Sequence, residues 1–186
     1  MKVIIVNGSG GVGKDTFIQY AIPHFIINNP NSLVIPYSII DPIKELMTKI
    51  GIKLDKDEKN RKFMSDFKLL MEDYNDLPYQ ELIKTFERAY SYSDNSVFIV
   101  VMREPKDISR FITELTHKYG FIGKDIYTVL VHNDRVKPIT SNIADASVND
   151  IKYDIFINNS GTYEELRNKA KEFVDYVMLN HTNEEE

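Results

Sequence analysis

The sequence predicts an α/β protein with a mostly parallel sheet of about five strands and helices on both faces. Short apolar runs rich in Val and Ile alternate along the chain with longer segments whose apolar residues repeat every three or four positions. The first run, at residues 3–6, is apolar throughout, which suits a strand of a parallel sheet that helices cover on both sides.

Five segments are expected to form the strands. The most apolar of them, SVFIVVM, should be a central strand, with a neighbour on each side. Pro36 in the second segment favours an edge or a strand end, because proline cannot donate a hydrogen bond to a neighbouring strand. The five segments cover residues 3–6, 33–37, 96–102, 126–131 and 153–157.

Helical patterns occupy most of the chain between these strands. The first begins near Thr16 and contains Pro23, so it is expected to kink or end near residues 20–22. Another covers 106–119 and ends at Gly120. These helices supply the crossovers that a parallel sheet requires.

A longer segment without a convincing strand follows the second strand. Asp41 and Pro42 open a helix that closes near Gly51, and two further amphipathic patterns follow it. We interpret residues 41–93 as a helical insertion within a single domain that spans 1–180.

The last third of the chain combines a polar segment with a final helix. Residues 132–150 show no long periodicity and are expected to form a lid-like loop. Thr162 precedes Glu165 by three residues, the spacing of a capping box, so the last helix should begin there. Residues 181–186 read as a flexible acidic tail.

The composition excludes several classes of function. The 186 residues include no Cys, which excludes disulfides, thiolate metal sites and cysteine nucleophiles, and the four His stand in no ligand spacing. The net charge of −5 argues against a nucleic-acid partner, although three terminal Glu residues contribute much of it and leave room for a small basic cleft. No segment suits a membrane span or a targeting sequence, so a cytoplasmic location is expected. The sequence does not determine the oligomeric state, and a homodimer is one possibility.

One motif points to nucleotide chemistry. Between the first predicted strand and the first predicted helix, the chain satisfies G-x-x-x-x-G-K with Gly8, Ser9, Gly10, Gly11, Val12, Gly13 and Lys14. Glycines let successive backbone N–H groups turn toward phosphate oxygens, and the following helix adds its positive N-terminal end. Lys14 is expected to reach the β- and γ-phosphates, and the motif therefore predicts a nucleotide-phosphate site.

The position after the lysine departs from the general pattern. Asp15 stands where a Ser or Thr hydroxyl normally meets Mg²⁺, and Thr16 follows it. The Asp15 carboxylate could hold a divalent cation, accept a proton from an acceptor hydroxyl, or only cap the helix start. The sequence leaves these alternatives open.

The run GKDT resembles the phosphate loop of phage-type deoxynucleoside monophosphate kinases and of animal-type phosphomevalonate kinases, two members of the nucleoside-monophosphate-kinase-like P-loop branch. The segments IIDPIKELM, FIVVMRE and DIFINNSGTYEEL are similar to later segments of that branch in the same order. This resemblance implies a P-loop NTPase fold, ATP and Mg²⁺ as cofactors, and small-molecule nucleotides as substrates.

The resemblance breaks at the end of the central strand. The family commonly reads Asp-Val-Arg there, with the Asp serving the metal, whereas this chain reads Val101-Met102-Arg103. Glu104 or Asp15 could take over the metal. The departure also leaves open a nucleotide-binding protein without kinase activity.

Further site residues are implied by the resemblance and by chain position. Arg103 would hold a substrate phosphate, and Arg135 would close over the transferred phosphoryl group, with structural ion pairs or solvated loop charges as the alternatives. Lys44 and Arg61 would bind the acceptor unless they merely belong to exposed helix faces.

The turn after the last strand completes the predicted site. Asn158 and Gly161 lie where this branch tends to hold the adenine base, and a plain Asn-rich turn is the alternative. Three functions remain in view: a kinase of (deoxy)nucleoside monophosphates, a kinase of another small phosphorylated metabolite such as phosphomevalonate, and a regulatory nucleotide-binding protein.

Overall fold

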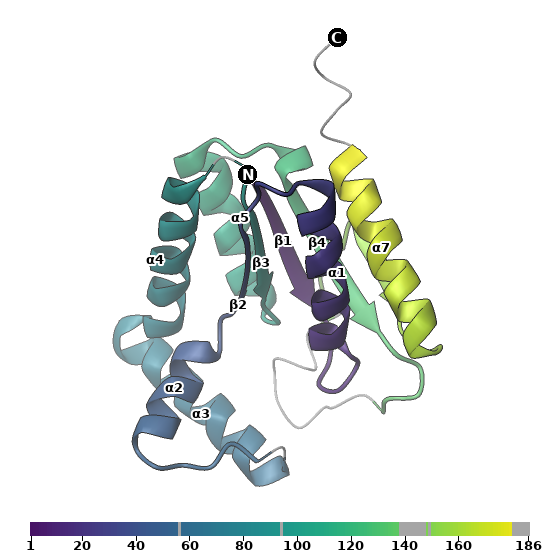
Figure 1. Ribbon diagram of the computed structural model, residues 1–186. Coiled ribbons are helices and arrows are strands. Elements are labelled where there is room, and N and C mark those ends of the chain that lie inside the picture. Colours follow the sequence, from purple (N-terminus) through teal and green to yellow (C-terminus); the bar gives the residue numbers. More distant parts are fainter. Residues whose placement is uncertain (56, 94, 138–147, 149, 180–186) are drawn as a thin grey trace.

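The computed structural model describes residues 1–55, 57–93, 95–137, 148 and 150–179 (Figure 1). Five strands, all parallel, form one sheet, which confirms the predicted α/β class. The sheet order is β2-β3-β1-β4-β5. The strands are β1 (Lys2–Asn7), β2 (Val34–Ser38), β3 (Val97–Val101), β4 (Ile126–His132) and β5 (Ile155–Asn158).

This strand order places a topological switch point at β1. The chain passes from β1 to the edge strand β2, returns through β3, and then crosses to β4 and β5 on the other side of β1. Open parallel sheets bind ligands at the carboxyl ends of the strands next to such a point. The glycine-rich segment begins directly after β1 and therefore lies at the place where the topology favours a ligand.

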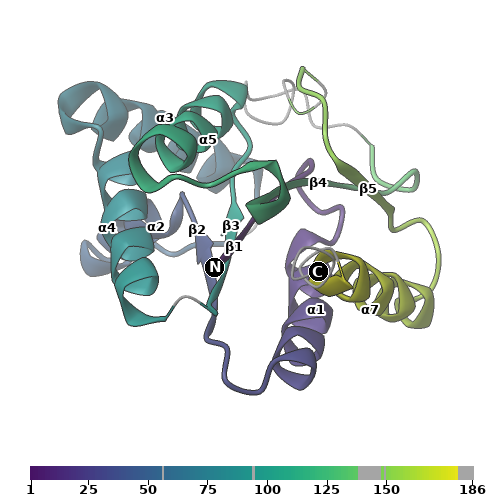
Figure 2. The ribbon, with the colours of Figure 1, turned by 90° about the horizontal axis from the view of Figure 1, so that it is seen from above.

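Helices cover both faces of the sheet (Figures 1 and 2). On one face α1 and α7 pack against each other, and α4 and α5 cover the opposite face. The described helices are α1 (Lys14–Asn28), α2 (Asp41–Lys49), α3 (Glu58–Asn75), α4 (Leu77–Tyr92), α5 (Pro105–Tyr119), the 3₁₀ helix η1 (Gly123–Asp125) and α7 (Tyr163–Leu179).

Alternation along β1 separates two apolar cores. Ile4 and Val6 point toward α1 and α7, whereas Val3 and Ile5 point toward α4 and α5. Phe86 of α4 packs edge-to-face on Phe98 of β3, and all these side chains are fully buried. The two cores fix the carboxyl edge of the sheet as a rigid support for the loops that follow each strand.

The prediction that the first helix could end near residues 20–22 is wrong. Helix α1 continues through Pro23 to Asn28. Proline removes only one N–H from the helix ladder, and Ala21 and Phe25 on either side of it are buried in the core that α1 shares with α7. Tertiary packing therefore outweighs the local cost of the proline.

The other predicted elements agree closely with the structure. Pro36 lies in the edge strand β2, as its missing N–H favours. Gly120 ends α5 in the left-handed conformation, with φ 74°. At the start of α7, the Thr162 backbone N–H donates to the Glu165 carboxylate at 3.0 Å, and the Glu165 N–H donates to Thr162 Oγ1 at 3.2 Å, which is the predicted capping box.

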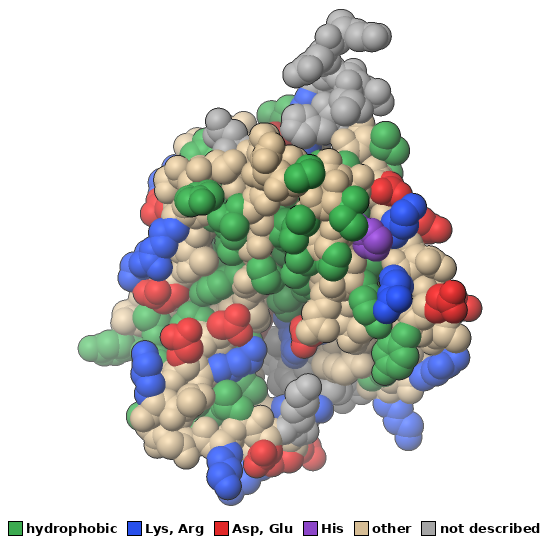
Figure 3. Space-filling model, in the orientation of Figure 1, with side chains coloured by type: hydrophobic (Ala, Val, Ile, Leu, Met, Phe, Trp, Pro, Cys, Tyr) green, Lys and Arg blue, Asp and Glu red, His purple; other side chains and the backbone are tan. Residues whose placement is uncertain are grey.

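The predicted helical insertion divides into two parts. Helices α2 and α3 extend beyond the carboxyl edge of the sheet, whereas α4 packs on the sheet itself (Figure 1). In the space-filling view, the surface is hollowed between α2 and α3 and the rest of the protein (Figure 3). Most of the predicted lid, 138–147 and 149, and the tail 181–186 lie outside the described residues. No described helix is long and apolar enough to cross a membrane.

Candidate functional site

The carboxyl edge of the sheet collects most of the residues that the sequence singled out. Gly8 follows β1, Arg103 follows β3, Arg135 follows β4, and Gly161 follows β5. Because the strands are parallel, their carboxyl ends meet at one edge. The fold thus gathers a phosphate-loop motif and two guanidinium groups from distant parts of the sequence.

The loop from Gly8 to Gly13 requires glycine at two tightly packed positions. Gly8 has φ 145°, and a Cβ there would lie 2.3 Å from the Val131 carbonyl oxygen. Gly13 has φ 95°, and a Cβ there would lie 2.2 Å from Asn159 Nδ2. The loop therefore passes so close to β4 and to the turn after β5 that larger residues do not fit.

Lys14 is the first residue of α1 and is buried, at 6% exposure. Its ammonium group donates hydrogen bonds to the Gly8 carbonyl at 2.5 Å and to the Ser9 carbonyl at 2.8 Å. The charge is consequently held inside the loop, beside the N-terminal end of a 15-residue helix. This arrangement concentrates positive potential where the motif predicts phosphate oxygens.

Asn7 is a supporting residue that the sequence analysis missed. Its side chain is fully buried at the end of β1, where Oδ1 accepts a hydrogen bond from the Gly8 N–H at 2.6 Å. Its Nδ2 group donates to the Arg103 carbonyl at 3.1 Å and to the Tyr153 hydroxyl at 2.7 Å. One amide therefore fixes the start of the phosphate loop, the end of β3 and the segment before β5 relative to one another.

The turn after β5 lies against the phosphate loop. Asn159 Nδ2 donates to the Val12 carbonyl at 2.8 Å, which joins the two loops. Arg135 Nη1 lies 3.5 Å from the Gly161 carbonyl, and Asn158 Nδ2 lies 3.4 Å from the Asp134 carboxylate. The structure thus brings the predicted residues Arg135, Asn158 and Gly161 together on the β4–β5 side of the loop.

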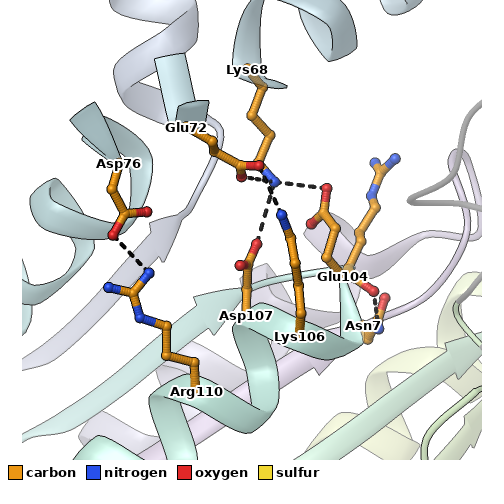
Figure 4. A network of polar contacts seen from close by, with 9 residues as sticks. Asn7, Lys68, Glu72, Asp76, Glu104, Lys106, Asp107 and Arg110 are labelled. Carbon is orange, nitrogen blue, oxygen red and sulfur yellow. Dashed lines mark hydrogen bonds and ion pairs between the residues drawn. The ribbon is translucent and has the colours of Figure 1, made fainter. Parts of the chain in front are cut away.

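A buried ionic network lies on the β3 side of the loop (Figure 4). The Lys68 ammonium of α3 lies 2.6 Å from Glu72, 2.7 Å from Glu104 and 3.4 Å from Asp107. Lys106 pairs with Glu72 at 3.1 Å. The network therefore joins α3 to the start of α5, directly after Arg103.

The charges of this network determine one another's pKa values. Burial alone would lower the pKa of Lys68, but the charge of Glu104, helped by Glu72 and Asp107, outweighs burial and raises it. Burial would raise the pKa of Glu72, yet the hydrogen bond and charge of Lys68 lower it. Lys68 is accordingly held as a cation at the centre of three carboxyl groups.

The same network bears on the predicted metal ligands. Glu104 Oε1 already faces the Lys68 ammonium, which occupies the space that a divalent cation would need beside that oxygen. Among the residues described, no three His, Asp or Glu side chains come together as a metal site. Asp15 is exposed in the first turn of α1, next to the loop. One carboxylate with substrate phosphates and water fits the way that Mg²⁺ is usually held in phosphoryl-transfer sites.

The two predicted acceptor residues lie on the protruding helices. Lys44 of α2 pairs with Asp41 at 2.8 Å. Arg61 of α3 is exposed and precedes Lys68 by seven residues, about two helical turns, so both residues lie on the same helix face. Lys68 on that face contacts Glu104, which follows β3. Arg61 therefore lies on the side of α3 that faces the carboxyl edge of the sheet. Neither residue contacts the phosphate loop in the contacts described.

The close approach at Gly8 gives a direct test of the loop geometry. Gly8→Ala should lower the free energy of unfolding by about 2 kcal/mol or more, because its Cβ would collide with the Val131 carbonyl. Gly120→Ala is the matched control, since Gly120 also has a positive φ but nothing lies within 4 Å of an added Cβ, and about 1 kcal/mol is expected there. Urea unfolding of both variants measures the difference, and equal losses would contradict the close approach.

Comparison with known proteins extends the description of the fold. No family model matches the sequence, and no curated protein matches it. The structure is similar to that of an unliganded sugar kinase from a Janibacter species, with a TM-score of 0.50 and 10% sequence identity. The match covers 97% of this chain and 98% of the sugar kinase. At this identity the likeness concerns the fold alone.

Proposed function

We propose that the protein transfers the γ-phosphoryl group of ATP to a small phosphorylated acceptor of the (deoxy)nucleoside monophosphate class. The observation that carries this proposal is the buried Lys14 ammonium, held inside a glycine loop at the switch point of a parallel sheet. The GKDT resemblance and the kinase-like fold of the solved neighbour support the reaction class.

In this proposal the chain's own residues position charge and exclude water. Backbone N–H groups of residues 8–14 and Lys14 hold the β- and γ-phosphates. The turn around Asn158 and Gly161 faces the donor base, and Arg135 closes over the transferred phosphoryl group. The Asp15 carboxylate would hold Mg²⁺, which when bound would supply positive charge to the phosphate oxygens. Phosphoryl transfer needs little covalent chemistry from the protein, so positioning and electrostatic stabilisation account for catalysis.

The acceptor would bind between the carboxyl edge and the protruding helices. In this proposal Arg103, which follows β3, holds the acceptor phosphate. Arg61 and Lys44 lie on the helices that border the hollow in Figure 3. A guanidinium group can bind a phosphate through two parallel hydrogen bonds. This division assigns the donor to the β4–β5 side of the phosphate loop and the acceptor to the β3 side.

A coupled assay tests the reaction class. The protein with ATP and Mg²⁺ should form ADP when supplied with one or more of the common ribo- or deoxyribonucleoside monophosphates, and phosphomevalonate is included as the competing acceptor. The reaction with ATP but no acceptor measures background hydrolysis of ATP. This rate should be low, because a kinase site that excludes water protects the γ-phosphoryl group from hydrolysis. Turnover of phosphomevalonate alone would show that the acceptor is not a nucleoside monophosphate. No turnover with any acceptor would refute the proposed kinase activity.

A pair of arginine substitutions tests the assigned acceptor side. Arg103→Ala should reduce kcat/KM for the acceptor by about 100-fold or more, because a charged partner of the transferred or acceptor phosphate is lost. Arg110→Ala is the control, because Arg110 lies on the outer part of α5, pairs with Asp76 and stacks on Tyr79. Similar kcat/KM values for the two variants would remove Arg103 from the site.

A regulatory nucleotide-binding protein is the second candidate. The observations that favour it are Val101 in place of the family's strand-end Asp and the engagement of Glu104 by Lys68. Calorimetry distinguishes the two functions. ATP binding that Mg²⁺ leaves unchanged, together with no binding of any monophosphate, would support the regulatory protein, whereas Mg²⁺-dependent ATP binding and acceptor binding would support the kinase.

A further inference from the structure

The outer face of α3 carries apolar side chains that no other described element covers. Leu70 is 62% exposed and Tyr74 is 81% exposed, and Phe63 and Leu69 are also exposed. Phe63, Leu70 and Tyr74 are separated by seven and four residues, which places these three side chains along one side of the helix. An exposed apolar stripe of this length on a surface helix marks an interaction site more often than chance exposure.

This stripe is separate from the candidate nucleotide site. At 3.6 residues per turn, Leu70 and Tyr74 are rotated from Lys68 by about 200° and 240° around the helix axis. Lys68 faces Glu104 at the end of β3, so the stripe faces away from that edge. Occupation of the stripe therefore leaves the phosphate loop accessible.

A surface hollow lies at the N-terminal end of the same stripe. Its volume is about 440 Å³, and its apolar floor includes Ile52 and Phe63, with Lys59 and Lys62 among the polar groups around them. Tyr74, the most exposed aromatic residue of α3, projects near the other end of the helix, eleven residues from Phe63. One end of α3 thus offers a hollow and the other end offers an aromatic side chain.

The charges along the stripe also differ between the two ends of α3. Lys59 and Lys62 lie at the hollow, and Asp73 lies beside Tyr74. Lys59 and Asp73 make no ion pair with another described residue, and Lys62 pairs with Asp66 only at the exposed surface. On the side of α3 that carries the stripe, two basic residues, Lys59 and Lys62, precede two acidic residues, Asp66 and Asp73. This side is therefore complementary to a copy of itself in the antiparallel orientation.

We propose that α3 is a homodimer interface, on which a second copy of this chain docks across a twofold axis with the two α3 helices antiparallel. Tyr74 of each chain packs on Phe63 in the hollow of the other, and Asp73 lies beside Lys62 and Lys59. Leu70 lies near the centre of the contact. Since one 18-residue helix supplies most of the surface, the dimer belongs to the small, reversible class of interfaces.

Sedimentation equilibrium of the full chain, from about 1 to 500 µM, tests the association. The wild type should dimerise reversibly in this range, and Leu70→Asp should weaken the dimer at least tenfold because it buries a charge at the apolar centre. Ile27→Asp, at an equally exposed apolar position on α1, is the control and should leave association unchanged. A monomeric wild type at 500 µM, or a dimer that Leu70→Asp does not weaken, would overturn the proposal.

Charge reversal tests the antiparallel orientation. Lys59→Glu/Lys62→Glu and Asp73→Lys should each weaken self-association, because each places like charges opposite one another. An equimolar mixture of the two variants should associate more tightly than either alone, since both contacts then pair opposite charges. Variants that associate like the wild type would exclude the antiparallel contact. Both outcomes are independent of nucleotide binding and of the proposed enzymatic function.

Discussion

Lys68→Met is expected to reduce the free energy of unfolding by about 3–5 kcal/mol, because it leaves buried carboxylates without their central cation. Lys68 is nearly inaccessible and contacts Glu72, Glu104 and Asp107. Without the Lys68 ammonium, only Lys106 would remain to balance three negative groups. The contact that joins α3 to the start of α5 would be lost at the same time.

A matched substitution on the same helix separates burial from charge. Lys62→Met removes an equivalent ammonium group from an exposed pair with Asp66, and a loss below about 0.5 kcal/mol is expected. Thermal unfolding and urea unfolding measure both variants. Equal losses from Lys68→Met and Lys62→Met would show that the buried network does not stabilise the fold.

The network should also make the stability of the fold depend on pH. The pKa of Glu72 lies below its ordinary value in the folded protein, so its contribution to stability is complete above the unfolded-state pKa and is lost as the pH falls through the folded-state value. In Lys68→Met, burial of Glu72 without its partner should raise that pKa. Carbon-detected NMR titration of the Glu72 carboxyl measures the change, and an unaltered pKa would mean that Lys68 does not set it.

Most of the fold follows from patterns that are local in the sequence. The β-branched run of β1, the left-handed Gly120 and the Thr162–Glu165 capping box each specify a conformation within a few residues. Pro23 shows where local reasoning fails. Whether a helix continues through proline depends on the tertiary contacts of its neighbours, Ala21 and Phe25, which belong to a core formed with α7 and the sheet.

The candidate site divides in the same way. The glycine-rich loop is contiguous in sequence, and its place between β1 and α1 could be predicted from its motif. The contacts that support this loop join distant segments and could not be predicted from it. Asn7 bonds to Arg103 and Tyr153, which lie 96 and 146 positions further along the chain. Lys68 contacts Glu104 and Asp107, which follow it by 36 and 39 positions. A lysine on an amphipathic helix resembles any solvated residue until the fold places carboxylates around it. Only the Glu72 four residues later was visible as a partner in the sequence.

Lys14→Met is expected to lower kcat for phosphoryl transfer by about a thousandfold. The Lys14 ammonium is buried between the Gly8 and Ser9 carbonyls, in the loop that would surround the donor phosphates. A cation fixed in advance in a site with little water stabilises the charge that develops on the transferred group, and loss of one such group costs about two to three orders of magnitude in rate. Methionine keeps the apolar length of the side chain, so the loop retains its packing.

The wild type and Lys14→Met are compared by the coupled assay with the acceptor that supports the highest turnover, and by calorimetry with ATP. Lys171→Met, which removes an exposed ammonium paired with Asp175 on α7, controls for the change in net charge and should keep wild-type kcat. Thermal unfolding establishes that Lys14→Met is folded at the assay temperature. A folded Lys14→Met protein with kcat within tenfold of the wild type would refute a catalytic role for Lys14 and for the phosphate loop. No neutral side chain can replace a cation that binds the γ-phosphate.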